Sequence, residues 1–472
     1  MRKRELTGDL YMASKTYFTN PELNLFSNTQ ITEQIRLIQQ TRLYPQLRYC
    51  YEHSSFYRRK FDEAGAKPED IQTLDDLRTL PIFMTKEVER ENVHGSLTEN
   101  GHPFGTHLCA SLDELYLTGT TSGTTGIPTF TYTFTKSDIE LIGKGLGHRF
   151  TYNGVGKGDR ILFVFSLGIY ATTMTLWGIR GLGALPIDID VHAGSELIIR
   201  FADLTKPKYM ATTPSLAEYL IHKAPAIIGK EVTDLGFKGL MLTGEIGVSI
   251  PEVKRKLETA YGCRVYDYWA PAGHAIAITC DSEEYHGMHG ISPDLCTSFD
   301  DLIDPETKKP VPIADGAIGE MVITSLKREA VPLIRYAYGD IVQIYTKPCP
   351  NCGFPGKRIR MIGRSDDMLI VKGVNIYPSA IKQVISSFVP KVTGEMRIVL
   401  DQPPPRVVPP LELKLEHGEE IREPELEGLA DEIGQALHDR CKVRPKIAWV
   451  NPGTLEKSST KTPIFEKIYE KE

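Results

Sequence analysis

The stretch Thr118-Gly-Thr-Thr-Ser-Gly-Thr-Thr-Gly-Ile-Pro128 is the most informative part of this chain. It holds five threonines, one serine and three glycines, and no bulky polar side chain. Glycine lets the backbone approach a ligand closely, and hydroxyl and backbone N–H groups suit phosphate oxygens or a magnesium ion. The Walker pattern GxxxxGK[ST] is absent. A Ser/Thr-rich surface turn is the alternative, but the density of the pattern favours a phosphate-binding loop of another type.

Four later segments give this loop a context. They are Gly319-Glu320, Tyr338-Gly339-Asp340, the run Gly363-Arg-Ser-Asp-Asp-Met-Leu-Ile-Val-Lys-Gly373, and Leu455-Glu-Lys-Ser-Ser-Thr-Lys461. Together with the loop, and in this order, they resemble the motifs of the AMP-forming acyl-adenylate superfamily, which includes acyl-CoA ligases, luciferases and adenylation domains. The resemblance covers nearly the whole chain, and the ordered set is far more specific than any single motif.

Two further segments narrow the resemblance to one branch. Ser54–Gly65, with the following Asp75-Asp-Leu-Arg and Leu80-Pro-Ile, is similar to the N-terminal region of phenylacetate–CoA ligases. Asp366-Asp-Met-Leu-Ile-Val-Lys-Gly-Val-Asn-Ile-Tyr-Pro378 is also close to the pattern of that branch. The resemblance implies ATP, magnesium and coenzyme A as reaction partners, and a small-molecule carboxylic acid as substrate.

Bulk composition fits this interpretation. The chain has 472 residues, enough for two or three domains, and its 41% apolar and 25% charged residues are ordinary for a globular protein. A formal charge of −6 argues against a nucleic-acid binder that works by phosphate neutralisation. We see neither an apolar stretch after the basic N-terminal residues nor a run long enough to span a membrane, and we expect a cytoplasmic protein.

The pattern of apolar residues predicts an α/β fold: a large N-terminal domain of mixed sheets covered by helices, and a small mobile α+β C-terminal domain. We place these domains at 1–363, with a helical part over about 1–110, and at 364–472. In the first, Ile31–Leu43 and a stretch beginning at Pro45 are expected to be separate helices. Expected strands begin at Arg160, Tyr209, Gly239 and Cys263, and expected helices of the second domain are Pro378–Phe388 and Glu425–Cys441.

The resemblance implies a nucleotide site. In the family, Asp340 would accept both ribose hydroxyls, a bidentate role that suits a carboxylate. A turn residue after Gly339 is the alternative. The expected nucleotide-binding residues are Thr118, Thr121, Ser122, Gly123, Thr124, Thr125, Gly126, Gly244, Glu245, Asp267, Tyr268, Asp340 and Arg364.

Three residues are expected to act in catalysis. Lys461 would bridge the carboxylate and the α-phosphate, although Thr460 stands where the family usually has glycine, and Lys457 and Lys467 compete for the role. Arg364 and Asp366 would form the hinge about which the C-terminal domain rotates between adenylation and thioester formation.

One motif departs from the family. Its Tyr-Gly-x-Ser/Thr-Glu, whose glutamate helps to hold magnesium, is matched here with Tyr268-Trp-Ala-Pro-Ala272. Magnesium would then be held by other groups, such as Glu245, Glu320, hydroxyls and phosphates. If Trp269 lines the acyl pocket where the family has glycine, the pocket should be smaller, and His274 could hydrogen-bond a polar group of the acid. A small, hydroxylated acid therefore stays open beside an arylacetic acid. The alternative is that Trp269 and His274 are core residues. The expected pocket residues are Phe165, Tyr170, Ser215, Trp269, Ala270, Pro271 and His274.

Cysteine spacing suggests a structural zinc ion. Cys349-x2-Cys352, followed by glycine, is a typical half of a tetrahedral zinc site, and Cys280 with His286 would supply the other half. Cys296, His289 and His274 are alternative ligands for that second half. A reduced pair of cysteines on a turn is the interpretation without a metal.

The leading interpretation is therefore an AMP-forming acyl-CoA ligase acting on an aryl, arylacetic or small hydroxylated acid. The alternatives are an adenylating enzyme whose acceptor is an amine, a carrier protein or another coenzyme, and a nucleotide-binding relative without catalysis, which only Ala272 and Thr460 favour. A homodimer is expected by analogy with the branch.

Overall fold

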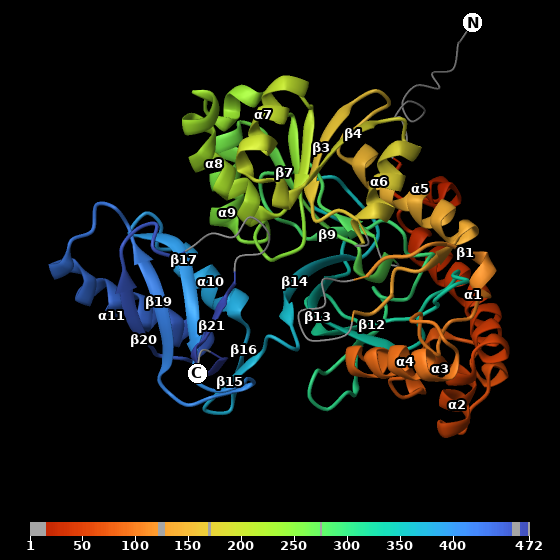
Figure 1. Ribbon diagram of the computed structural model, residues 1–472. Helices are drawn as coiled ribbons and strands as arrows, with labels where there is room; N and C mark the ends of the chain where they lie inside the picture. Colours follow the sequence, from red (N-terminus) through yellow and green to blue (C-terminus); the bar gives the residue numbers. More distant parts are fainter. Residues whose placement is uncertain (1–15, 121–127, 169–170, 274–275, 456–462, 471–472) are drawn as a thin grey trace, which may run out of the picture.

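The computed structural model describes residues 16–120, 128–168, 171–273, 276–455 and 463–470. Its N-terminal region is helical and lies at one end of the molecule, at the side opposite the C-terminal lobe (Figure 1). The helices of this region are α1 (Ile31–His53), α2 (Ser55–Glu63), α3 (Leu74–Thr79) and α4 (Lys86–Glu99).

Helix α1 differs from the prediction, because it is a single helix that continues through Pro45. Proline has no N–H for the helical ladder, which usually ends or kinks a helix. Here the residues on both sides of it, Leu43 and Leu47, are fully buried in the same core. Burial of this face stabilises the helix across the proline.

A sheet of twelve strands forms the centre of the large lobe, and its strand directions change once. From β4 to β7 the strands are parallel, and from β7 to β11 every neighbouring pair is antiparallel. The strand order is β11-β10-β12-β13-β14-β9-β8-β7-β6-β5-β3-β4. The bounds are β3 (Arg160–Phe165), β4 (Leu185–Asp190), β5 (Tyr209–Thr212), β6 (Gly239–Leu242), β7 (Arg264–Trp269), β8 (Ala277–Ile278), β9 (Met288–Gly290), β10 (Leu302–Ile303), β11 (Pro310–Val311), β12 (Ile318–Ile323), β13 (Tyr336–Tyr345) and β14 (Arg358–Arg364).

Helices cover both faces of the parallel half (Figure 1). Along β3, Ile161 and Phe163 join one hydrophobic core, whereas Leu162 and Val164 join another, as alternation in a strand buried on both faces requires. The first core packs under α5 (Lys136–Tyr152) and α6 (Thr172–Gly181); the second packs under α7 (Ser195–Thr205), α8 (Pro214–Ile228) and α9 (Pro251–Tyr261).

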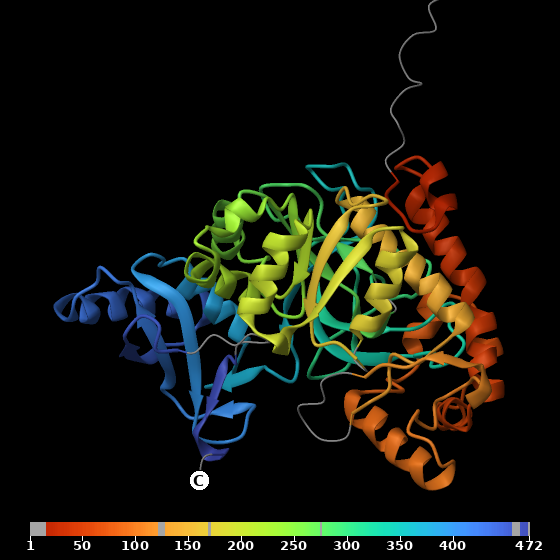
Figure 2. The same ribbon diagram turned by 45° about the horizontal axis from the view of Figure 1, so that its top comes forward.

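A smaller lobe follows β14 and lies to one side of the large sheet (Figure 2). It has its own hydrophobic core, which includes Leu369, Ile385, Leu413 and Ile433. Its elements are β15 (Leu369–Val371), β16 (Val374–Ile376), α10 (Pro378–Ser386), β17 (Val392–Leu400), β18 (Arg406–Val407), β19 (Leu411–His417), α11 (Glu423–Cys441), β20 (Pro445–Val450) and β21 (Phe465–Lys467).

These two lobes confirm the predicted fold class of mixed sheets covered by helices with a small α+β lobe. The mobility of the small lobe stays a prediction. Of the helices that the structure describes, none combines the length and the hydropathy that crossing a lipid bilayer requires.

Candidate active site

The predicted phosphate loop rises from a hydrogen-bonded stem. Strands β1 (Leu115–Leu117) and β2 (Phe134–Thr135) pair on either side of it. Above them, the Thr118 and Thr133 hydroxyls lie 2.8 Å apart and the Thr120 hydroxyl donates to the Thr129 carbonyl at 2.8 Å. Both ends of the loop are therefore fixed. Its centre, with the predicted residues Thr121, Ser122, Gly123, Thr124, Thr125 and Gly126, lies outside the described residues.

Glu89, on α4, ties this stem to strand β13. The Thr131 hydroxyl donates to one Glu89 carboxylate oxygen, and the Tyr336 hydroxyl donates to the other at 2.6 Å. Burial raises the pKa of Glu89, although these hydrogen bonds oppose the shift. Because Tyr336 begins the strand that carries Asp340, the contact brings two motifs 200 residues apart in sequence to one place.

Arg328 connects the stem to the segment that departs from the family pattern. Its buried guanidinium donates to the carbonyls of Thr131 at 2.8 Å, Thr133 at 2.9 Å and Ala272 at 3.0 Å. Ala272 has a φ of 50°, which is uncommon for a residue with a side chain. Arg328 therefore holds an unusual backbone turn against the base of the phosphate loop.

Asp340 is buried and holds two donors. The Trp269 indole N–H donates to one carboxylate oxygen at 3.0 Å, and the Arg364 guanidinium donates to the other at 2.6 Å. Trp269 ends β7 and Arg364 ends β14, so Asp340 collects groups from both halves of the sheet. The predicted ribose carboxylate is thus a fixed acceptor with charge compensation rather than a turn residue.

Arg364 also reaches the predicted hinge residue. Its guanidinium donates to both carboxylate oxygens of Asp366, at 2.8 Å and 3.0 Å. Burial disfavours the charged guanidinium, but Asp340 and Asp366 outweigh it, so the pKa of Arg364 is raised above its ordinary value. Gly339 has a φ of 93°, and a Cβ there would lie 2.8 Å from the guanidinium. Glycine at this position allows the arginine to lie so close.

The parallel half contributes the ends of its strands. The backbone N–H of Ser215, in the first turn of α8, donates to the Glu245 carboxylate at 2.6 Å. Gly244, with a φ of 93°, turns the chain between β6 and Glu245. Phe165 ends β3 with its ring 4.9 Å from that of Phe163. The predicted residues of this half therefore lie at the carboxyl ends of strands, where ligands bind in such sheets.

Asp267 and Tyr268 lie two residues and one residue before Trp269 on β7. The Tyr285 hydroxyl donates to the Asp267 carboxylate at 2.9 Å, and burial raises the pKa of Asp267 to about 7. Tyr268 is buried, with the Arg149 guanidinium 4.1 Å from its ring centre. Both residues have protein partners, and their predicted contact with the nucleotide stays untested.

Trp269, predicted for the acyl pocket, donates its indole N–H to Asp340, the predicted ribose carboxylate, and its contact with an acyl group stays a prediction. Ala270 is partly buried and Pro271 is buried beside it. The other predicted site residues Tyr170, His274 and Lys461 lie outside the described residues.

Glu320 does not lie on the same face of the sheet as Asp340. It pairs across the strands with Ile341, so its side chain lies on the opposite face of the sheet from that of Asp340. There its carboxylate accepts from Lys308 at 2.6 Å. The sequence-based hypothesis that Glu320 helps to hold magnesium is therefore wrong in this conformation.

A cysteine–histidine cluster lies beside the strands β8 and β9, with Cys280 just after β8 and His289 on β9. One ligand atom each from Cys280, His289, Cys349 and Cys352 lies within 4.8 Å of all the others. The Cys280 and Cys349 sulfurs are 3.9 Å apart, and Cys352 lies 3.9 Å from the His289 ring nitrogens. Tetrahedral zinc with bonds of about 2.0–2.3 Å separates its ligands by roughly 3.5–4 Å, so the geometry fits such an ion.

The histidine of this cluster corrects the prediction. His286 was expected to complete it, but its ring faces Glu284 at 4.0 Å, whereas His289 lies on β9 and joins the cysteines. The Tyr152 hydroxyl lies 2.7 Å from His289 Nδ1, and the Phe354 ring stacks on the imidazole with centroids 4.5 Å apart. These contacts orient the ring as the outer partners of metal-bound histidines do.

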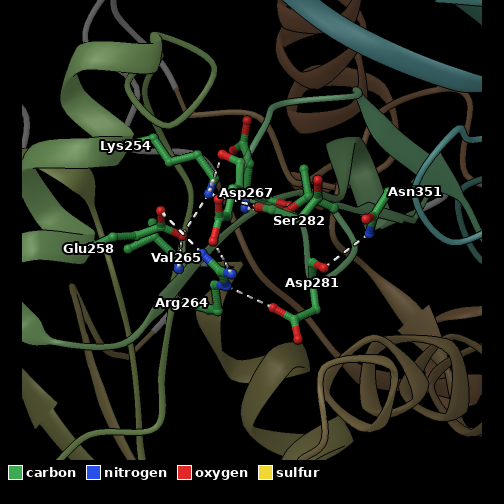
Figure 3. A network of polar contacts seen from close by, with 10 residues as sticks. Lys254, Glu258, Arg264, Val265, Asp267, Asp281, Ser282 and Asn351 are labelled. Atoms are coloured by element: carbon green, nitrogen blue, oxygen red, sulfur yellow. Dashed lines mark hydrogen bonds and ion pairs between the residues drawn. The ribbon is translucent and has the colours of Figure 1, made fainter.

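A polar network braces the cluster from outside (Figure 3). Asn351 donates to the Asp281 carbonyl at 3.0 Å and to the Cys280 sulfur at 3.5 Å. On the other side, buried Lys254 donates to Glu258 at 2.6 Å and to the Ser282 carbonyl at 2.9 Å. The segment that carries Cys280 is therefore fixed both to α9 and to the Cys349–Cys352 turn.

Sequence patterns did not reveal Glu89, Arg328 or Lys86. The Lys86 ammonium lies 3.8 Å from an Asp366 carboxylate oxygen. None of these three residues stands in a run of motif residues. Their importance comes from contacts between segments distant in the chain, for which a single sequence holds no signal.

Comparisons with known proteins bear on the family that this chain resembles. Residues 373–466 match the family model described as the AMP-binding enzyme C-terminal domain. The phenylacetate-coenzyme A ligase of Thermus thermophilus is 28% identical over 422 residues, covering 88% of this chain and 89% of the relative. That of Escherichia coli is 28% identical over 383 residues, covering 78% and 80%. The resemblance to the phenylacetate–CoA ligase branch of the AMP-forming acyl-adenylate superfamily is thereby confirmed.

Solved structures of 2-hydroxyisobutyryl-CoA ligase are similar over both lobes. The one in the postadenylation state with 2-HIB-AMP matches with a TM-score of 0.80 at 27% identity, covering 93% of this chain and 90% of that one. The same enzyme in the thioesterification state matches with a TM-score of only 0.64, at 28% identity and coverages of 93% and 91%. The lobes of this chain are thus arranged more like those of the postadenylation state.

The raised pKa of Asp267 leads to a test. Since the folded value of about 7 exceeds the usual value of 3.8, the folded state retains a proton that the unfolded state releases. Its contribution to stability is complete below about pH 4 and is lost as the pH rises to about 7. We expect Asp267→Asn to remove this loss, raising the free energy of unfolding at pH 8 by on the order of 2 kcal/mol relative to wild type, with little change at pH 4. Urea unfolding from pH 4 to pH 8 measures it, and parallel wild-type and variant curves would contradict it.

Proposed function

We propose that this protein is an AMP-forming carboxylate–CoA ligase, which joins a carboxylic acid to AMP with release of pyrophosphate and then transfers the acyl group to coenzyme A. The observation that carries the proposal is the single group formed by Asp340, Arg364 and Asp366 beside the stem of the phosphate loop. The acid belongs to the aryl and arylacetic acids or to the small hydroxylated acids, the classes named for the similar ligases.

In the first step, the formation of the acyl-adenylate, the described residues have separate roles. Asp340 accepts hydrogen bonds from the ribose hydroxyls, and Trp269 and Arg364 hold its carboxylate in position for these bonds. The threonine stem anchors both ends of the loop, whose predicted role is to contact the phosphates, where charge develops as the carboxylate attacks. A magnesium ion, when bound, would neutralise phosphate charge, and Glu245 with loop hydroxyls would hold it. A homodimer stays a prediction of the resemblance, and a cytoplasmic location stays a prediction of the sequence.

The acid is identified by a product assay. Purified full-length protein with ATP and magnesium is offered phenylacetate, benzoate, 2-hydroxyisobutyrate and related acids, and pyrophosphate and AMP are measured with and without coenzyme A. We expect one class to give acid-dependent pyrophosphate release, with sustained AMP release only when coenzyme A is present.

Other outcomes of this assay point to the alternatives. One burst of pyrophosphate that coenzyme A leaves unchanged indicates another acceptor. ATP binding without product from any acid indicates a relative that has lost catalysis.

Two lysines near the C-terminus make a matched pair for the adenylating role. Lys461 is the predicted residue, and Lys467 on β21 is bound to Glu470 at 2.8 Å. We expect Lys461→Met to slow adenylate formation by at least about 100-fold, because a charge that stabilises the transition state is lost. Thioester formation from supplied acyl-adenylate should be retained. Lys467→Met should alter neither rate by more than about twofold, and equal effects of both changes would refute the assignment.

We further propose that Cys280, His289, Cys349 and Cys352 hold a structural zinc ion. Three thiolates and one imidazole with no open position are typical of structural rather than catalytic zinc. The metal would take these cysteines as thiolates.

The two neighbouring histidines test the zinc site. We expect about one zinc per chain by elemental analysis of wild-type protein and of His286→Ala, whose ring lies outside the cluster. His289→Ala and Cys352→Ser should lose the metal and unfold at a Tm lower by about 5 °C or more, because metal binding no longer favours the folded state. Zinc-free wild type, or equal retention in His289→Ala, would reject the site.

A further inference from the structure

Lys86 occupies a position that helix stability does not explain. It is the first residue of α4, after the capping residue Thr85, whose hydroxyl accepts from the Val88 N–H. A cation at the N-terminal end of a helix is opposed by the helix dipole. Burial lowers the pKa of Lys86, and the positive charge of Arg364 lowers it further. Both effects, like the helix dipole, disfavour the charged ammonium.

The carboxylate of the predicted hinge residue Asp366 offsets the free-energy cost of keeping Lys86 charged at this position. The Lys86 ammonium lies 3.8 Å from an Asp366 carboxylate oxygen, on the side chain that also receives Arg364. It lies 5.3 Å from the centre of the Tyr338 ring, and Arg364 lies 5.8 Å from the same ring. Two cations therefore meet two carboxylates, Asp340 and Asp366, around one aromatic ring.

The start of α4 is fixed to the large lobe, so Lys86 acts from a rigid base. The Phe83 N–H donates to the Arg335 carbonyl at 3.1 Å, and the Ala337 N–H donates to the Met84 carbonyl at 3.0 Å. Together with the buried Glu89 contact to Tyr336, these bonds hold the N-terminal end of α4 against β13. Asp366, by contrast, begins the segment that leads into the small lobe.

We propose that Lys86 is a positioning residue for the hinge: its contact with Asp366 stabilises the adenylation arrangement of the two lobes and must break when the small lobe turns to form the thioester. The proposal rests on the ligase function proposed above. The lobes are seen here in an arrangement more similar to the postadenylation state than to the thioesterification state of a similar ligase, and the contact is formed in it.

Measuring adenylate formation and thioester formation separately distinguishes a hinge-positioning role of Lys86 from a general effect on activity. In single-turnover experiments with the full chain, we expect Lys86→Met to slow adenylate formation about three- to tenfold, as loss of a partly exposed ion pair allows. Formation of thioester from supplied acyl-adenylate and coenzyme A should be unchanged or faster. Lys86→Arg should restore most of the first rate. Lys60→Met, a lysine paired with Glu63 on α2, is the matched control and should change neither.

A double-mutant cycle identifies the route of the effect. In an Asp366→Asn background, Lys86→Met should have little further effect, because its partner charge is already gone. An undiminished effect in that background would show that Lys86 acts on the nucleotide directly and would overturn the proposal. Equal slowing of both half-reactions by Lys86→Met would overturn it as well.

A readout without catalysis keeps this inference distinct from the proposed function. Small-angle X-ray scattering of ligand-free protein should show Lys86→Met shifted away from the lobe arrangement seen here, with wild-type and Lys60→Met profiles alike. If no acid yields adenylate but the shift occurs, the ligase function fails and the hinge contact stands. If wild type forms adenylate and neither the rates nor the scattering change, the hinge contact fails alone.

Discussion

The ion pair between Asp340 and Arg364 is the contact on which the rest of this site depends. It joins two neighbouring antiparallel strands at the point where the second of them ends and the small lobe begins. The same guanidinium then binds Asp366 two residues later. A ligand that contacts Asp340 therefore alters the charges around the hinge through a single side chain.

The change from parallel to antiparallel strands explains why the site lies where it does. Trp269 ends the last parallel strand, and the neighbouring β8 runs in the opposite direction. Beyond this boundary the loop after β6 contacts β14, where the Arg360 guanidinium donates to the Ser249 carbonyl at 3.1 Å. Helix α4 and the phosphate-loop stem approach from a third side through Glu89. Three regions of the chain thus contribute, and each is anchored by buried polar contacts.

The sequence supported the fold class and the motif residues better than their surroundings. Asp340, Arg364 and Asp366 stand in short contiguous motifs, and their chemistry can be interpreted without coordinates. Glu89 and Lys86 could not be found this way, because their partners lie about 250 residues away and only packing brings them together. Three of the residues predicted for a zinc site lie in one cluster, but the prediction preferred His286 to His289, since two histidines three residues apart are indistinguishable by spacing. The strand β9 decides between them: it points His289 inward. Pro45 was misjudged because local propensity was outweighed by burial on both sides.

The cysteine–histidine cluster also has a consequence for the biosynthesis of the protein. Its ligands lie on both sides of β10 to β13, so a nascent chain cannot complete the set until nearly all of the antiparallel half has left the ribosome. Until then, Cys280 and His289 form at most a weak half-site, and the closing loop is long. With zinc bound as proposed, metal acquisition would thus follow rather than nucleate the pairing of these strands, and a chain short of the metal would be left with free thiols at Cys280, Cys349 and Cys352.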